Sequence, residues 1–171
     1  MRIVGGRLAG KALTSPNDFR VRPTSEALRG AALARLTLEL PDASVLDLFA
    51  GTGALGLEAL SRGARRCDFV ETRPASLHAL KANIVALGMK PRTRVFKKDA
   101  LPFAAALSRD AYDLAFVDPP YGSRMLDHVI SDWVRTGFAR TLVAEHARSH
   151  ILPPGAETIG NGDSAITIYR R

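Results

Sequence analysis

The stretch Asp47-Leu48-Phe49-Ala50-Gly51-Thr52-Gly53-Ala54-Leu55-Gly56 decides the fold that this sequence predicts. It places a Gly-x-Gly-x-x-Gly pattern between a predicted buried strand, 44–49, and a predicted helix, 55–61. Glycines at such a junction let the backbone approach a ligand closely. Glu71 ends the next predicted strand, 20 residues after Gly51, where an acid accepts hydrogen bonds from a ribose diol. The pattern therefore predicts an adenosine cofactor, and NAD, FAD and S-adenosylmethionine all satisfy it.

The rest of the chain alternates between strand and helix patterns. Further strands are predicted at 68–70, 93–96, 112–117 and 141–144, and further helices at 25–38 (with Thr24 as the N-cap), 74–87, 101–107 and 125–134. Asn161-Gly162 is typical of the turn of a closing hairpin, and Gly5-Gly6 of the turn of an N-terminal hairpin over residues 2–13. Such alternation predicts an α/β fold, with a mostly parallel sheet and helices on both faces.

Composition and length restrict the class of protein. At 171 residues, with 46% hydrophobic and 24% charged residues, the chain is expected to form a single globular domain. No apolar run is long enough to cross a bilayer, so we expect a cytoplasmic protein that is not bound to membranes. Cys67 is the only cysteine, which excludes a disulfide framework. No metal site is expected, since metal-ligand spacing is also missing from the four histidines, His78, His128, His146 and His150.

The net charge of +7 favours a polyanionic partner. Near the N-terminus, five basic residues stand against one acid, Asp18: Arg2, Arg7, Lys11, Arg20 and Arg22. A second basic group surrounds Val95: Lys90, Arg92, Arg94, Lys97 and Lys98. Aromatic residues do not alternate with either group, so charge attraction to phosphates is predicted rather than a stacking platform.

A second motif, Asp118-Pro119-Pro120-Tyr121, directly follows a predicted buried strand. Neither proline donates a backbone hydrogen bond, so the segment is a stiff loop at the edge where open α/β sheets bind ligands, unless it is only a turn. Hydride transfer has no need of such a loop. Asp47 adds negative charge that suits the amino-acid tail of a sulfonium cofactor better than a pyrophosphate. Asp99 is placed either to accept from the adenine amine or to cap the next helix.

Both motifs, together with Arg22-Pro23-Thr24 and the run from Asp47 to Ala64, resemble the RsmD family, almost from end to end of the chain. The family methylates N2 of a guanine in bacterial 16S ribosomal RNA. The resemblance implies a Rossmann-like class I methyltransferase with a seven-stranded sheet, and a monomer whose partner is 16S rRNA, a 30S subunit or an assembly intermediate. It implies a single domain, 1–171, in which residues 1–23 form an RNA-facing hairpin extension and residues 24–171 the catalytic core.

The resemblance also assigns roles to residues. S-adenosylmethionine would be held by Asp47, Phe49, Gly51, Gly53, Glu71, Asp99 and Asp118. The methionine end would face Asp47, Gly51 and Gly53, the ribose would face Glu71, and the adenine would face Asp99. Catalysis would involve Asp118, Pro119, Pro120 and Tyr121, and RNA phosphates would contact Arg7, Lys11, Arg20 and Arg22. In this scheme the Asp118 carboxylate and the Pro119 carbonyl accept hydrogen bonds from the target amine, and Tyr121 stacks on the base.

The sequence departs from the family at two places, which bear on how the substrate is held. The first helix reads Arg29-Gly30-Ala31-Ala32-Leu33 where the family carries an acid and a phenylalanine, and the part after Glu145 matches poorly. One alternative is a methyltransferase acting on adenine N6 or cytosine N4 of DNA or another RNA. Two further alternatives are a NAD-type Rossmann oxidoreductase and an RNA-binding module without catalysis.

Overall fold

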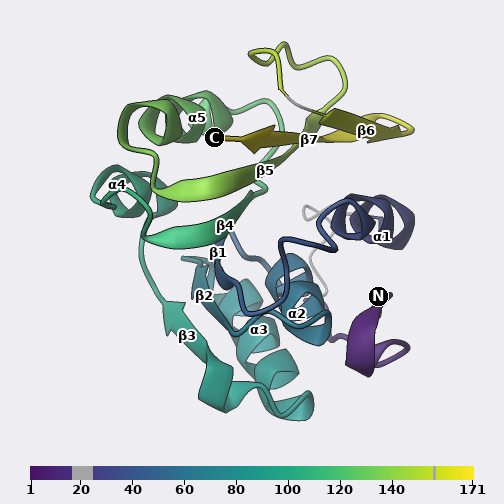
Figure 1. The fold of residues 1–171 in the computed structure, drawn as a ribbon. Coiled ribbons are helices and arrows are strands. Elements are labelled where there is room, and N and C mark those ends of the chain that lie inside the picture. The colour runs from purple at the N-terminus through teal and green to yellow at the C-terminus, as the bar shows by residue number, and fades with distance from the viewer. Residues whose placement is uncertain (17–24, 156) are drawn as a thin grey trace.

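The computed structural model describes residues 1–16, 25–155 and 157–171, and its centre is a seven-stranded sheet (Figure 1). The strand order is β3-β2-β1-β4-β5-β7-β6. The strands are β1 (Ser44–Leu48), β2 (Arg66–Val70), β3 (Thr93–Phe96), β4 (Tyr112–Val117), β5 (Ala139–Ala147), β6 (Glu157–Asn161) and β7 (Ser164–Arg170). The first five run parallel, whereas β7 is antiparallel to both β5 and β6. The sheet is thus mixed, and the predicted α/β fold and closing hairpin are confirmed.

In the described part of the chain, five α-helices connect or precede these strands: α1 (Glu26–Ala34), α2 (Ala54–Ser61), α3 (Pro74–Ala86), α4 (Ala100–Ala105) and α5 (Met125–Thr136). The N-cap of α1 is Ser25, whose hydroxyl accepts from the Leu28 N–H at 3.1 Å, and not the predicted Thr24, which lies outside the described residues. Pro74 begins α3, as predicted. Proline is favoured there because the N–H groups of the first turn make no hydrogen bond within the helix, so the N–H that proline lacks is not needed. None of the helices among the described residues is long and apolar enough to span a bilayer.

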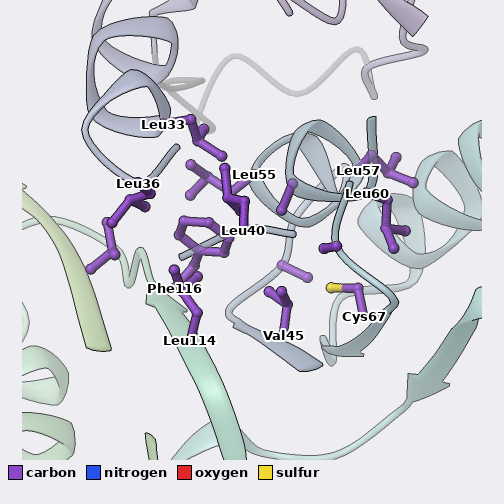
Figure 2. Close-up of a cluster of buried hydrophobic side chains, with 14 of the residues drawn as sticks. Leu33, Leu36, Leu40, Val45, Leu55, Leu57, Leu60, Cys67, Leu114 and Phe116 are labelled. Carbon is purple, nitrogen blue, oxygen red and sulfur yellow. The ribbon is translucent and has the colours of Figure 1, made fainter. Parts of the chain in front are cut away.

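Side chains of the central strands alternate between two apolar cores, one on each face of the sheet. Leu114 and Phe116 of β4 join the core under α1, α2 and α3, whereas Ala115 and Val117 join the core under α4 and α5. Figure 2 shows the first core, in which Cys67 of β2 lies among leucines from α2. A Cβ added at Gly56 would lie 2.6 Å from the Cys67 sulfur, so α2 packs directly onto β2. This close packing fixes the helix start beside the ends of the strands.

The N-terminal segment, residues 1–16, does not form the predicted β-hairpin. A 3₁₀-helix, Gly6–Leu8, occupies its turn, and one isolated bridge, Arg2 to Ala12, joins its two arms. The backbone N–H groups of Val4 and Gly5 donate instead to the Glu58 carboxylate of α2, at 2.8 and 2.6 Å. The segment therefore docks on side chains of α2, while backbone hydrogen bonds from Ile3 to Lys11, from Gly10 to Ile3 and from Leu13 to Met1 hold its two arms together.

Candidate functional site

A cavity of about 490 Å³ opens at the carboxyl ends of β1, β2 and β4. Its volume is typical of a site for a small molecule. Connections from these neighbouring strands leave toward opposite faces of the sheet, so the cavity lies at the switch point where such folds bind ligands. Its walls come from the loops after the three strands, the start of α2 and the N-terminal segment.

The structure brings together all but one of the residues predicted to bind the cofactor or to act in catalysis. The cavity is lined by Asp47, Phe49, Gly51, Glu71, Asp99, Asp118, Pro119, Pro120 and Tyr121. Gly53 is the exception, and its role is conformational. It has φ 81° and precedes α2 as the N-cap residue, while Gly51 and Phe49 also have positive φ, 56° and 60°. Three left-handed residues within five positions make the tight loop that connects β1 with α2, residues 49–53, which we call the glycine loop.

Replacing Gly53 with alanine should lower the free energy of unfolding by about 1–3 kcal/mol through overpacking and backbone strain. The new Cβ would lie 2.4 Å from Cδ1 of Leu80, a fully buried side chain of α3. The matched control is Gly122→Ala, since Gly122 has a similar φ of 76° but nothing within 4 Å of the added carbon. Urea titration of both variants separates the packing effect from the backbone effect. Equal losses would show that packing against Leu80 contributes nothing.

Asp47 lies at the floor of the cavity with 1% of its surface exposed. Its carboxylate accepts a hydrogen bond from the Gly56 N–H at 2.9 Å. Burial disfavours the charged form and raises the pKa of Asp47 to about 8, although the bond from Gly56 acts in the opposite direction. At neutral pH the protonated form is therefore favoured until a cation enters the cavity.

Glu71 organises the opposite wall. Its Oε2 accepts from the Gly51 N–H at 2.8 Å, and its Oε1 accepts from the N–H groups of Thr72 and Arg73, both at 2.8 Å. Burial would raise the pKa of Glu71, but the hydrogen bonds from Arg73 and Gly51 outweigh it and hold that pKa below its ordinary value. A carboxylate that is ionised at neutral pH thus joins the glycine loop to the end of β2.

Asp99 takes one of its two predicted roles, that of a helix cap, and the other, contact with the adenine amine, stays a prediction. Its Oδ1 accepts from the Leu101 N–H at 3.0 Å and so caps α4, and the residue also lines the cavity. Because a carboxylate has two oxygens with several lone pairs, capping does not exhaust its capacity to accept.

The Asp118-Pro119-Pro120-Tyr121 loop forms the remaining wall. The Asp118 N–H points to the Leu48 carbonyl at 3.5 Å, which ties the loop to the end of β1. The Tyr121 hydroxyl lies 2.9 Å from the Ser164 hydroxyl of β7 and 3.2 Å from a Glu145 carboxylate oxygen of β5. Burial raises the pKa of Tyr121 to about 12, so the ring stays neutral. The hydroxyl at the tip of this side chain is therefore anchored, and the residue lines the cavity.

Of the residues predicted to contact RNA, the two that the structure describes, Arg7 and Lys11, do not line the cavity. Arg7 lies near the far end of α2, where its guanidinium approaches the Met89 sulfur at 3.7 Å and its neighbour Leu8 donates to Ser61. Since α2 has eight residues, this point is about 12 Å from the helix start that borders the cavity. Lys11 is exposed on the same segment, and Arg20 and Arg22 fall outside the described residues.

Several residues of the site were missed by sequence reasoning. The cavity wall includes Met1, Ser15 and Pro16 of the N-terminal segment, and Tyr121 depends on Glu145 and Ser164. None of these belongs to a local motif, so the sequence offered no signal for them. Among the described residues, no group of three or more His, Cys, Asp or Glu side chains is arranged to hold a metal ion.

The residues that line the cavity lie within the part of the chain that is similar to known proteins. Residues 1–153, which include all those lining the cavity, match the family model described as "Conserved hypothetical protein 95". The chain is 30% identical to "Putative rRNA methyltransferase YlbH" of Bacillus subtilis (strain 168), covering 100% of this chain and 99% of the relative. It is 36% identical to Ribosomal RNA small subunit methyltransferase D of Escherichia coli (strain K12), over 77% of this chain and 65% of the relative. The solved structure titled "Putative methyltransferase yhhF from Escherichia coli" has a TM-score of 0.86 and 30% identity, covering 100% and 97% of the two chains.

Proposed function

Because this chain belongs to the Conserved hypothetical protein 95 family, a family of S-adenosylmethionine-dependent methyltransferases, we propose that it methylates the N2 amine of a guanine in 16S ribosomal RNA. The observation that carries the proposal is that one cavity joins the glycine loop and Glu71 to the Asp118-Pro119-Pro120-Tyr121 wall. A cofactor pocket alone would serve many reactions. An acid, a carbonyl and an aromatic ring beside it suit a planar base that carries an amine.

The donor set of the cavity fits S-adenosylmethionine. The buried Asp47 suits the ammonium group of its amino-acid tail, the ionised Glu71 suits the two ribose hydroxyls, and Asp99 suits the adenine amine. When bound, the cofactor supplies an electrophilic methyl group on a sulfonium. The Arg73 guanidinium lies 3.4 Å from both Glu71 oxygens, and its side chain is 45% exposed, so it can move into solvent when a diol occupies those oxygens.

On the substrate side, the loop after β4 makes the amine a better nucleophile. The lone pair of an exocyclic amine is delocalised into the base, and acceptors for its two N–H groups favour the form that attacks. The Asp118 carboxylate accepts one N–H and the Pro119 carbonyl the other, while the Tyr121 ring stacks on the base. Much of the rate then comes from positioning, and the target base must leave its stack to enter the cavity. Water or Asp118 takes the proton after transfer.

The affinity for S-adenosylmethionine should peak near pH 8. The carboxyl pKa of Asp47 is raised from 3.8 to about 8. Below that pH, the ammonium group of the cofactor must therefore displace the proton of this carboxyl when it binds. One proton released gives about a tenfold rise in affinity per pH unit on the acid side. Above the peak the affinity falls, because an α-amino group loses its own proton near pH ~8.

Isothermal titration in buffers of different ionisation enthalpy measures this released proton directly at pH 6.5. Without the cofactor, the same pKa predicts that the free energy of unfolding falls as the pH rises from about 4 to 8. In that range the folded state holds more protons than the unfolded state. An affinity that stays flat from pH 6 to 8 would show that Asp47 does not meet the ammonium.

The predicted RNA residues suggest how far the substrate extends. Lys11 and Arg7 would contact phosphates along α2, away from the target base, with Arg20 and Arg22 on the chain that follows. Such contacts add affinity that depends on salt and carry no base specificity.

The function is tested by methyl transfer from labelled S-adenosylmethionine to 16S rRNA that lacks the modification, supplied either naked or in 30S particles. Nuclease digestion and chromatography identify the methylated nucleoside. We expect N2-methylguanine at a single site in one of the two substrates. Product recovered as N6-methyladenine or N4-methylcytosine would overturn the guanine assignment, and a DNA duplex in a parallel reaction tests the DNA alternative.

A further inference from the structure

One buried side chain, Asn83 of α3, connects two segments that are far apart in sequence. Its Oδ1 accepts from the Thr14 N–H at 2.7 Å, and its Nδ2 donates to the carbonyls of Thr14 and Thr52, both at 3.0 Å. Asn83 is 1% exposed. The N-terminal segment and the glycine loop are therefore held by the same amide group.

Both partners of Asn83 adjoin the cavity. Thr52 lines it within the glycine loop, and Thr14 precedes Ser15 and Pro16, which form part of its wall. The Leu13 N–H donates to the Met1 carbonyl at 2.9 Å, which also brings Met1 to the wall. A displacement of residues 13–16 would therefore alter the cavity itself.

The connection resists movement because the Asn83 amide and its bond to the Thr52 carbonyl are buried, although Thr14 itself is exposed. An asparagine amide offers two donors and a carbonyl acceptor, and Asn83 uses both ends on backbone groups. If either segment moved, a buried polar group would lose its partner, which is more costly than the loss of an exposed hydrogen bond. Movement of the glycine loop is thus transmitted to the N-terminal segment.

We propose that Asn83 is a positioning residue that couples the glycine loop to the N-terminal segment, so that S-adenosylmethionine binding strengthens the docking of residues 13–16. By thermodynamic reciprocity, a segment held in place also raises affinity for the cofactor. The proposal rests on the proposed function only in that the cavity binds S-adenosylmethionine. If the segment also contacts RNA, cofactor binding would prepare the protein for its substrate.

The first test compares Asn83→Ala with Ser61→Ala by isothermal titration with S-adenosylmethionine. Ser61 holds the other end of the same segment, through the Leu8 N–H at 3.0 Å and the Gly5 carbonyl at 2.6 Å, and does not line the cavity. Asn83→Ala should raise the Kd about fivefold or more, at the lower end of typical couplings. Ser61→Ala should stay within about twofold of wild type. Equal losses in both variants would overturn the proposal, since they would reflect general docking of the segment.

The second test needs no variant. Amide hydrogen exchange at Thr14 and Leu13 in the wild-type protein should slow when S-adenosylmethionine is saturating, and the slowing should disappear in Asn83→Ala. Unchanged exchange in the wild type overturns the coupling even if Asn83→Ala fails to fold. Because neither test uses RNA, a wrong guanine assignment would leave their results intact.

Discussion

Replacing Asp118 with alanine should lower the rate of methyl transfer about 10²–10³-fold, which is typical for loss of one hydrogen-bonding group that stabilises the charge developing in the transition state. The affinity for S-adenosylmethionine should remain near that of wild type, because Asp47, Gly51 and Glu71 carry most of the polar contacts expected on the cofactor side. Asp118 is half-buried in a loop, so stability should change little. Single-turnover transfer and isothermal titration measure the two quantities separately.

Two further variants sharpen the interpretation of Asp118. Asp118→Asn keeps one acceptor oxygen and should retain part of the rate. Asp127→Ala removes an exposed acid from the following helix that does not line the cavity, so it should leave transfer unchanged. If the cofactor affinity of Asp118→Ala falls as far as its rate, the carboxylate belongs to the cofactor site and is not a catalytic group.

Glu58→Ala should lower the free energy of unfolding by about 3–5 kcal/mol, the cost of leaving one partner of a buried ion pair unpaired. Both Glu58 and Arg29 have fully buried side chains, 3.4 Å apart. The Glu58 carboxylate also accepts from the N–H groups of Val4 and Gly5 and pairs with Arg62 at 3.0 Å. The substitution thus removes the carboxylate that pairs with two guanidinium groups, those of Arg29 and Arg62, and that accepts from two backbone donors.

Urea unfolding measures this loss against Arg170→Ala, which removes the partner of Glu39, 2.8 Å away, from a pair that is about one-third exposed. That control should cost no more than about 1 kcal/mol. The double variant Arg29→Met with Glu58→Leu should recover part of the stability, since apolar side chains can replace a buried ion pair. If Glu58→Ala costs no more than the control, the N-terminal segment is held by its apolar contacts alone.

The cofactor side of the cavity could be predicted from sequence because its parts are local. Gly51, Glu71 and Asp118 each end a strand whose apolar run is plain in the sequence, and parallel strands bring such ends to one edge. Strands β3 and β4 occur at the predicted residues, 93–96 and 112–117, for the same reason. The family and the fold follow from these motifs, as the comparisons confirm.

The N-terminal segment could not be predicted in the same way. Its Gly5-Gly6 pair is typical of a hairpin turn, but the partners that decide its conformation, Glu58 and Asn83, lie 53 to 69 residues away along the chain. A single acid or amide inside a helical pattern carries no sign of what it will contact. The same holds for Glu145 and Ser164, which anchor Tyr121 only after β5 and β7 have paired.

Because Cys67 is buried, the rate at which its thiol is alkylated measures how often the protein opens around it. Burial, with the nearby carboxylates of Asp47 and Asp68, raises the pKa of its thiol, and only the thiolate reacts with alkylating reagents. Modification must therefore wait for α2 to open from β2, and the alkylation rate in native buffer records how often that happens. A bound cofactor makes such openings rarer in proportion to its occupancy. Since Cys67 is the only thiol of the chain, a fall in its alkylation rate reports the fraction of protein that holds ligand, without any engineered probe.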